Sequence, residues 1–487
     1  MASSRPSAAA QRTALLCLLL CLGSFVTDVA AQAQTRRVSG GSSGSWQRGR
    51  PRRVRKELRS LSPREYKMYL QGVSTMLTVP TAAGQKIFGS KYKDYATIVI
   101  RHAVAVPDMR GDQGHYVPCF MTFHCAVMLE FENALLSVVP ELSAMPYWNF
   151  LLDAPGGKYY KTDRWAFGDL YGGSMVGDPD VGYAVTDGVF GWRQITRYSA
   201  KRFAEYQQFY SGSPKGFVRG LKSTVDNPYI VRFPANELAP AVNSGGETSS
   251  GLDFSSLKLS PRLIPTFYNA ATNNTLPAWL KQDYENCLTA HISDWAKWAW
   301  CVDVDFALNA VNVTEASQYL PGASPLMHGM THALIGGLLA KKNQFGDMAD
   351  IITSPNDVAF FMPMHANLDR SNMMFQANSQ YRNSSMARDD VMWNYPKSQA
   401  EYAKCPIGCR LHDVINSNAK FTDIFDPPKS TGFTHFDVLD RTRPDTADYT
   451  YDEVWGALPL YIRGYTNRPG APQNGGQRPG GRQPGGK

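Results

Sequence analysis

The sequence predicts a mainly α-helical protein with long loops and short strands. Several stretches combine helix-capping residues or apolar residues at helical spacing, and most of the chain's clustered histidines fall on these stretches. Residues 155–275 are instead rich in Gly, Tyr, Ser and Pro with weak periodicity, which indicates loops and short strands. With 487 residues, 43% hydrophobic and 12% aromatic, the chain can bury a sizeable core.

The first 31 residues are typical of an export signal. Arg5 and Arg12 supply positive charge, an apolar run from Ala14 to Leu22 follows, and small residues at 29–31 form a cleavage site. The apolar run is too short to span a membrane, and no other stretch reaches about 18 apolar residues. We therefore expect a secreted protein without a membrane span.

Residues 32–51 are expected to form a disordered basic leader. The basic run extends slightly further: Arg48, Arg50, Arg52, Arg53, Arg55 and Lys56. It is interpreted as solvated and preceding the fold; binding of a polyanion and convertase cleavage at residues 50–53 are the alternatives. No segment resembles a nucleic-acid-binding module.

Three sequons, at Asn273, Asn312 and Asn383, fit glycosylation during export. Six cysteines remain after signal removal, an even number that fits disulfides in an oxidising compartment. Cys287–Cys301 and Cys405–Cys409 are the pairs closest in sequence, and disulfide pairing is also expected for Cys119 and Cys125.

The predicted folded domain covers residues 52–456, and a Gly/Pro-rich disordered tail covers 457–487. The first helix of the folded domain is predicted to start at Pro63, with Ser62 as N-cap and Glu65 closing a capping box. An apolar stripe follows at helical spacing: Tyr66, Tyr69, Leu70, Val73 and Leu77.

Three further helices carry histidines. One runs from about Phe120 to a limit at Pro140 and holds His124. The next holds His328 and His332, one turn apart on the same face, and is interrupted or ended by Gly336-Gly337. The last is expected to open at Ser354-Pro355 and places His365 on its Phe361/Leu368 face.

Six of the nine histidines form two groups of three: His102, His115 and His124, and His328, His332 and His365. Three neutral imidazoles suit a borderline ion such as copper, zinc or iron, and helices of a bundle can present such ligands inward. A single zinc site at His328 and His332 is the simpler alternative, but it would leave the first group unexplained. Satisfied core histidines are the other alternative. The joint pattern favours two metals.

The motifs around these histidines resemble those of the tyrosinase, catechol oxidase and haemocyanin superfamily of type 3 copper proteins. The first motif runs from His115 through Phe120, Phe123 and His124 to Phe131-Glu132. The others are Pro146-Tyr147-Trp148-Asn149-Phe150, His328 to Gly337, Ser354-Pro355-Asn356-Asp357, His365-Ala366-Asn367-Leu368-Asp369 and Tyr449-Thr450-Tyr451.

This resemblance implies a central four-helix bundle holding two copper ions, one on each histidine triad. It also implies that a phenolic small molecule and O2 are the reactants, with an o-diphenol oxidised to an o-quinone. No catalytic residue beyond the six ligands is expected. The oligomeric state is not predicted.

Several positions depart from the family pattern. Phe123 and Cys125 replace the Trp and Arg that flank the histidine of the helix motif, and Met364 replaces the first histidine of a His-His pair. Gln113 occupies the position of the cysteine that forms a thioether in fungal and molluscan members, so no bridge of that form is expected.

Gly329 follows the first histidine of the second triad, where tyrosinases that hydroxylate monophenols often have asparagine working with an upstream glutamate. The upstream position here is Tyr319, and the nearest acidic residue is Glu315. Gly329 and Met364 are therefore the expected substrate-tuning positions, and they favour diphenol oxidation over monophenol hydroxylation.

Three other functions share this ligand set: an oxygen carrier, a catalytically silent copper glycoprotein, and a zinc-loaded isomerase of the tyrosinase-related kind. Carriers cover the site with a shielding domain, and the Gly/Pro-rich segment after Tyr451 does not resemble one. The presence of all six ligands argues against a silent site. Metal analysis separates the zinc alternative.

Overall fold

The computed structural model describes residues 53–105, 114–115, 119–162, 175–196, 227–235, 302, 327–339, 344–350, 352–377, 410–417, 419–444 and 446–452. Helices dominate this part of the chain, and its strands have two or three residues each, so the mainly α-helical fold class is confirmed.

The α-helices are α2 (Pro63–Thr78), α3 (Thr81–Phe88), α4 (Tyr95–Ala103), α5 (Phe120–Val138), α13 (Met327–Gly336), α14 (Phe361–Ala377) and α17 (His435–Arg441). Short 3-10 turns are η1 (Leu58–Ser60), η2 (Pro140–Leu142), η3 (Phe150–Leu152), η4 (Pro179–Val181), η8 (Asp347–Ala349) and η9 (Ser354–Asn356). The strands are β1 (Arg53–Arg55), β2 (Leu338–Leu339), β3 (Gln344–Phe345) and β4 (Tyr449–Tyr451).

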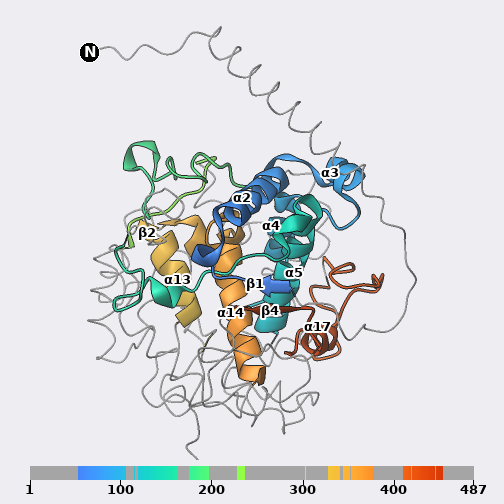
Figure 1. Cartoon of the computed structure of the whole chain (residues 1–487). Helices are drawn as coiled ribbons and strands as arrows, with labels where there is room; N and C mark the ends of the chain where they lie inside the picture. The colour runs from blue at the N-terminus through green and yellow to red at the C-terminus, as the bar shows by residue number, and fades with distance from the viewer. Residues whose placement is uncertain are drawn as a thin grey trace, which may run out of the picture.

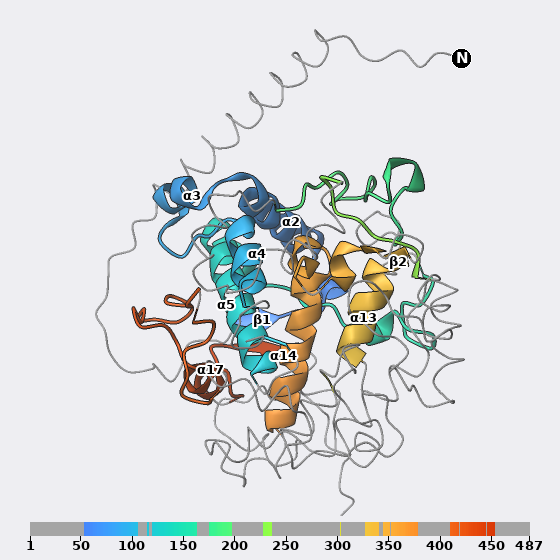
Figure 2. The ribbon, with the colours of Figure 1, turned by 180° about the vertical axis from the view of Figure 1, so that it is seen from behind.

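Helix α5 lies at the centre of the helical assembly. It contacts α2, α4, α14 and α17, and nearly all its side chains are buried. Helices α5 and α14 run side by side in two opposite views, and α13 flanks α14 on the other side (Figures 1 and 2). This arrangement brings the elements that carry the two histidine triads together around one core.

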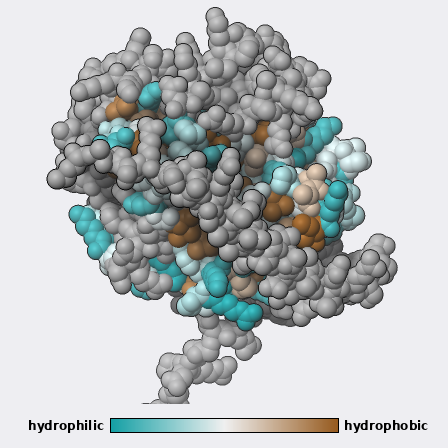
Figure 3. Space-filling model, turned by 90° about the horizontal axis from the view of Figure 1, so that it is seen from above, coloured by the Kyte–Doolittle hydropathy of each residue, from teal (hydrophilic) through white to brown (hydrophobic). Residues whose placement is uncertain are grey.

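Most large apolar side chains of the described residues lie in that core. The exposed ones are Val54, Val181, Val189 and Trp192. On the face seen from above, hydrophilic and hydrophobic residues of the described part are intermixed in small patches (Figure 3). None of the described helices is both long and apolar enough to cross a membrane.

Most of the predicted helix ends are confirmed. Helix α2 begins at Pro63, and Ser62 and Glu65 form the full capping box. Helix α5 ends two residues before Pro140. Helix α13 ends at Gly336, and Gly337 adopts a φ of +69°, a left-handed conformation that favours glycine after a helix.

The predicted start of the fourth helix is wrong. Residues 354–356 form only the 3-10 turn η9, and α14 begins at Phe361. The chain turns at Asp357, whose carboxylate accepts two hydrogen bonds from Arg232 at 2.7 and 2.8 Å. The backbone carbonyl of Asp357 then accepts hydrogen bonds from Phe360 and Phe361, so this residue organises the entry to α14.

The interpretation of the whole basic run as solvated is also wrong. Strand β1 pairs in parallel with β4, with Arg53 opposite Tyr449 and Arg55 opposite Tyr451. The Arg55 side chain is fully buried and forms ion pairs with Glu132 at 2.7 Å and Asp369 at 3.0 Å. Two buried carboxylates thus compensate the desolvation of this guanidinium.

Cys125 is a buried free thiol, so the disulfide expected for it is wrong. It lies in the interior of α5, with its Sγ 3.9 Å from the hydroxyl of Tyr449. The other predicted pairs, Cys287–Cys301 and Cys405–Cys409, lie outside the described residues, as do the three sequons, the signal, the leader and the tail.

Candidate metal centre

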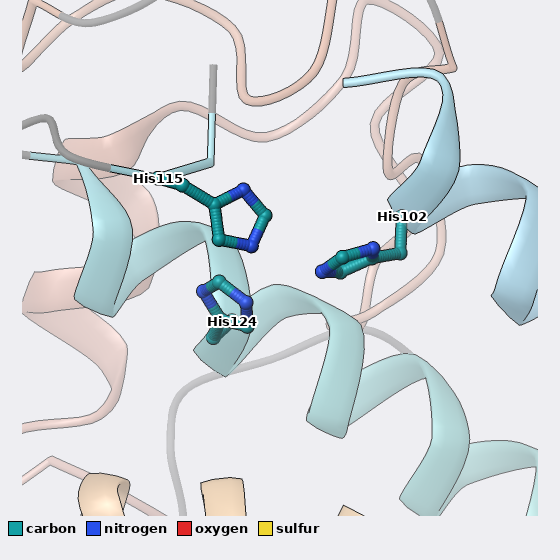
Figure 4. A group of neighbouring side chains, drawn as sticks. All are labelled: His102, His115 and His124. Atoms are coloured by element: carbon teal, nitrogen blue, oxygen red, sulfur yellow. The ribbon is translucent and has the colours of Figure 1, made fainter. Parts of the chain in front are cut away.

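The first triad joins two helices and a loop. His102 lies in the last turn of α4, His115 follows Gly114 in the connecting segment, and His124 lies on α5. One ring nitrogen from each lies within 4.8 Å of the others, and all three side chains are buried. Their nitrogens face a shared space between the rings (Figure 4).

The second triad uses one turn of α13 and the first half of α14. The Nε2 atom of His328 lies 2.9 Å from that of His332 and 3.1 Å from that of His365. All three residues again offer nitrogens within 4.8 Å of one another. The i, i+4 spacing on α13 therefore does place two imidazoles on one side, as the sequence predicted.

The two triads are neighbours in space. The rings of His124 and His365 stack with centroids 4.5 Å apart and planes inclined by 9°, and His124 lies 6.2 Å from His328. The ring of Phe361 packs against His365 at 4.1 Å and His102 at 5.2 Å, so one phenylalanine contacts both groups.

Burial favours the neutral form of five of these imidazoles. It is the largest cause that lowers the pKa of His102, His124, His328 and His365 well below 6.5, and the neighbouring histidines lower it further. Burial also lowers the pKa of His332 to about 4, against the opposing effect of its hydrogen bond to Met348. A neutral imidazole has the free lone pair that a metal ion requires.

Three histidines are oriented by backbone carbonyls. The Nδ1 atom of His124 donates to Phe120 at 3.0 Å, that of His332 to Met348 at 2.7 Å, and that of His365 to Phe361 at 2.8 Å. Such a bond fixes the tautomer and leaves Nε2 available as the ligand atom. Buried Nε2 of His124 has no hydrogen-bond partner in the described part of the chain.

These features fit a pair of metal ions. The donors are imidazole nitrogens, three to a group, and the Nε2 atom of His328 lies 2.9 and 3.1 Å from two others, close enough for the three to bind one ion. Nitrogen-only sites of this kind suit copper, iron or zinc rather than magnesium or calcium. The six histidines predicted from the sequence are thus brought together in two groups, consistent with a dicopper site.

The predicted tuning positions lie beside the second triad. Gly329 is buried next to His328 on α13, and Met364 is fully buried next to His365 on α14. The position of Gln113, relevant to a thioether, lies outside the described residues, as do Glu315 and Tyr319.

Aromatic side chains surround the triads, and some of them connect different elements. Phe120 lies 4.6 Å from His124 and 4.8 Å from His328, and Phe123 lies 5.1 Å from His124. Phe421, far along the chain, was not predicted, and its ring lies 6.3 Å from that of Phe123. Helical spacing predicted that Phe120 and Phe123 share a face with His124 and that Phe361 shares one with His365, and these contacts are confirmed. No local signal indicates Phe421.

Comparison with known proteins finds relatives that are similar to part of this chain or distantly similar to most of it. A curated relative, the tyrosinase-like protein phomQ1′ of Diaporthe leptostromiformis, is 30% identical over 101 residues, 21% of this chain and 24% of the relative. The aligned part thus spans only about a quarter of that relative's length.

Solved structures similar to the chain include tyrosinase from Burkholderia thailandensis, at 17% identity and a TM-score of 0.41, covering 82% of this chain and 74% of that one. Another is the Grenache (Vitis vinifera) polyphenol oxidase, at 16% identity and a TM-score of 0.39, covering 86% and 89%.

The family match is broader than the curated alignment. Residues 91–378, more than half of the chain, match the common central domain of tyrosinase. That region contains all six histidines of the two triads. The chain therefore belongs to the tyrosinase family of type 3 copper proteins.

Proposed function

We propose that this protein is a secreted, copper-dependent polyphenol oxidase that oxidises o-diphenols to o-quinones with O2. The observation that carries the proposal is the stacking of His124 on His365, which places the two triads side by side. We assign His102, His115 and His124 to one copper ion and His328, His332 and His365 to the other. Copper supplies the redox chemistry that neutral imidazoles lack.

The residues of the chain contribute geometry and a dry environment. Carbonyls of Phe120, Met348 and Phe361 hold three ligand rings in place before any metal binds. Buried aromatic rings, Phe120 and Phe361 among them, exclude water from the imidazoles. A flat catechol ring would meet apolar side chains around the triads, with its hydroxyl groups directed to the metal pair.

Gly329 supports a diphenol as the substrate. It offers no side chain to hold a water molecule beside His328, so the chain lacks at this position the group that would help to deprotonate a monophenol. A catechol has two adjacent hydroxyl groups and gives up two electrons without a hydroxylation step.

Oxygen uptake tests the proposal. Copper-loaded protein is supplied with catechol and, in parallel, with L-tyrosine, and the zinc-loaded protein serves as the control. Uptake with catechol alone is the expected result. Uptake with both substrates would make the protein a tyrosinase and contradict the role given to Gly329. Reversible O2 binding without consumption of catechol would favour the oxygen carrier.

Secretion is tested separately. Expression of the full sequence in a eukaryotic host should deliver the protein to the medium with its N-terminus near residue 32, as read by mass spectrometry. Retention of the first 31 residues in a cell-associated product would contradict the export signal.

A further inference from the structure

One ligand of the first triad lacks the anchor that orients three of the others. His124, His332 and His365 each hydrogen-bond a backbone carbonyl through Nδ1. Both ring nitrogens of His102 are buried and have no hydrogen-bond partner within the described residues. One of them is available to a metal, but no acceptor fixes the other, so something else must set the position of this ring.

Aromatic packing restricts the His102 ring only in part. Its centroid lies 5.2 Å from that of Phe361 and 5.7 Å from that of Phe123. These contacts limit rotation of the ring, but they do not determine how far the end of α4 extends toward the triad. The position of the His102 backbone depends on what holds the last turn of this nine-residue helix.

The neighbouring residue, Arg101, holds that turn. Its Nε lies 2.7 Å from Oε2 of Glu130, an ion pair without a well-aligned hydrogen bond. Its Nη1 donates to the carbonyls of Ala419, at 3.1 Å, and Lys420. The carbonyl of Arg101 in turn accepts a hydrogen bond of 2.7 Å from Asn416. Glu130 and residues 416–420 thus both bind the end of α4 next to His102.

Glu130 makes this contact relevant to the metal. It lies on α5, six residues after His124, and its side chain is only 2% exposed. The ion pair therefore joins the helix that carries His102 to the helix that carries His124. The guanidinium of Arg101 also lies 5.1 Å from the ring centre of Phe421. Phe421 in turn packs against Phe123, which contacts the rings of the first triad.

We propose that Arg101 is a positioning residue for the first metal site. Its ion pair with Glu130 holds His102 in position, the role that a hydrogen bond to a backbone carbonyl has for His124, His332 and His365. The inference rests on the proposed binding of two copper ions. It makes a site-selective claim: loss of the ion pair weakens the first site and leaves the second, on α13 and α14, unaffected.

The test measures copper affinity at one triad at a time. His328→Ala breaks the second triad, so that the bound ion reports the first, and His115→Ala does the reverse. Arg101→Met is introduced into each background, and the copper dissociation constant is measured by competition with a chelator of known affinity. Because Arg101→Met leaves Glu130 as an unpaired buried carboxylate, Arg101→Met/Glu130→Gln is measured alongside, and circular dichroism checks that each variant is folded.

Two variants serve as controls. Arg101→Lys keeps the charge and should recover most of the lost affinity. Lys91→Met removes contacts of the same C-terminal segment, through the carbonyl of Asp423 and the carboxylate of Asp426, without touching Glu130. It should leave both dissociation constants unchanged.

The expected result is about 10- to 100-fold weaker copper binding at the first triad in both Arg101→Met variants, which is typical when a supporting residue of a metal ligand is lost. Equal affinities in variant and parent, or equal weakening at both triads, would overturn the proposal. If wild-type protein binds two copper ions but does not consume oxygen with catechol, the proposed oxidase function fails while the positioning role stands. If it binds none, both fail.

Discussion

The imidazoles of His124 and His365 are stacked face to face, and each is held in the same way. Each Nδ1 donates to the carbonyl four residues earlier in its own helix, Phe120 in α5 and Phe361 in α14. The two helices therefore present matching ligands at a centroid separation of 4.5 Å. This local pairing sets the distance between the two triads.

Replacement of one member of that pair should remove one metal ion and not both. We expect His365→Ala to lower the copper content from about two ions per chain to about one, because the first triad keeps its three ligands. Elemental analysis after dialysis against copper gives the ratio. His412→Ala, at an exposed histidine outside both triads, should retain two ions; loss of copper there would contradict the assignment.

Copper should also stabilise the fold, since the triads gather six imidazoles that the unfolded chain leaves dispersed. At a free copper concentration about 1,000 times the dissociation constant, one site contributes about 4 kcal/mol to the free energy of unfolding. We expect removal of copper with a chelator to lower the unfolding temperature, as followed by calorimetry. A His124→Ala/His365→Ala variant should show little of this shift.

Gly114 allows His115 to reach the first triad. A Cβ atom at this residue would lie 2.6 Å from two ring carbons of Phe123, which is buried among the ligands and cannot move aside. We expect Gly114→Ala to weaken copper binding at the first triad about tenfold, as measured in the His328→Ala background. Gly114→Ala/Phe123→Leu should recover part of the loss; no recovery would show that steric conflict with this ring is not the cause.

Glu132 should contribute an acid-labile part of the stability. Burial raises its pKa, but the guanidinium groups of Arg53 and Arg55 outweigh that effect and lower it from 4.5 to about 2. Because the folded-state pKa is depressed, the contribution is complete above pH 4.5 and is lost as the pH falls toward 2. Its size is on the order of 3 kcal/mol.

Chemical denaturation of the metal-free protein at a series of pH values checks this. Glu132→Gln should be less stable than the wild type above pH 4.5, and the difference should shrink toward pH 2. The exposed Glu141→Gln should follow the wild-type curve. A constant difference between Glu132→Gln and the wild type across this range would contradict the depressed pKa.

Gly329→Asn tests the origin of substrate preference. A carboxamide beside His328 could hold a water molecule, so we expect a higher ratio of L-tyrosine to catechol turnover than in the wild type. Gly329→Ala adds volume without an amide and is the matched control. The same ratio in both variants would show that this position does not act through a polar group.

Local sequence signals predicted much of the site, but not all of the helices and long-range contacts that hold it in place. The capping box at Ser62 and Glu65 and the i, i+4 pair at His328 and His332 act within one or two turns, and both are confirmed. Helix α4 was missed, although Asp94 caps it by accepting a hydrogen bond from Thr97. This helix has only nine residues, fewer than the window over which apolar periodicity identifies a helix, so periodicity alone did not indicate it.

Long-range partners explain the larger errors. Arg55 was interpreted as solvated because its carboxylate partners, Glu132 and Asp369, lie 77 and 314 residues further along the chain. The start of α14 was misplaced because Arg232, 125 residues earlier, binds Asp357. No pattern within a window of a few turns contains such pairs, and a capped Ser-Pro start looks the same whether a helix or a 3-10 turn follows.

The pairing of β1 with β4 sets an order of events during synthesis. All six histidines leave the ribosome before Tyr449 and Tyr451 are made, yet these tyrosines flank the buried Arg55, which stacks on the Tyr449 ring at 3.7 Å and donates to the Tyr451 hydroxyl at 2.7 Å. Until Tyr449 and Tyr451 have been synthesised, the charge of Arg55, at the start of the domain, is incompletely buried. The helices that bear the histidines can thus form on the growing chain, but the domain closes around them only when almost all of it has been translated.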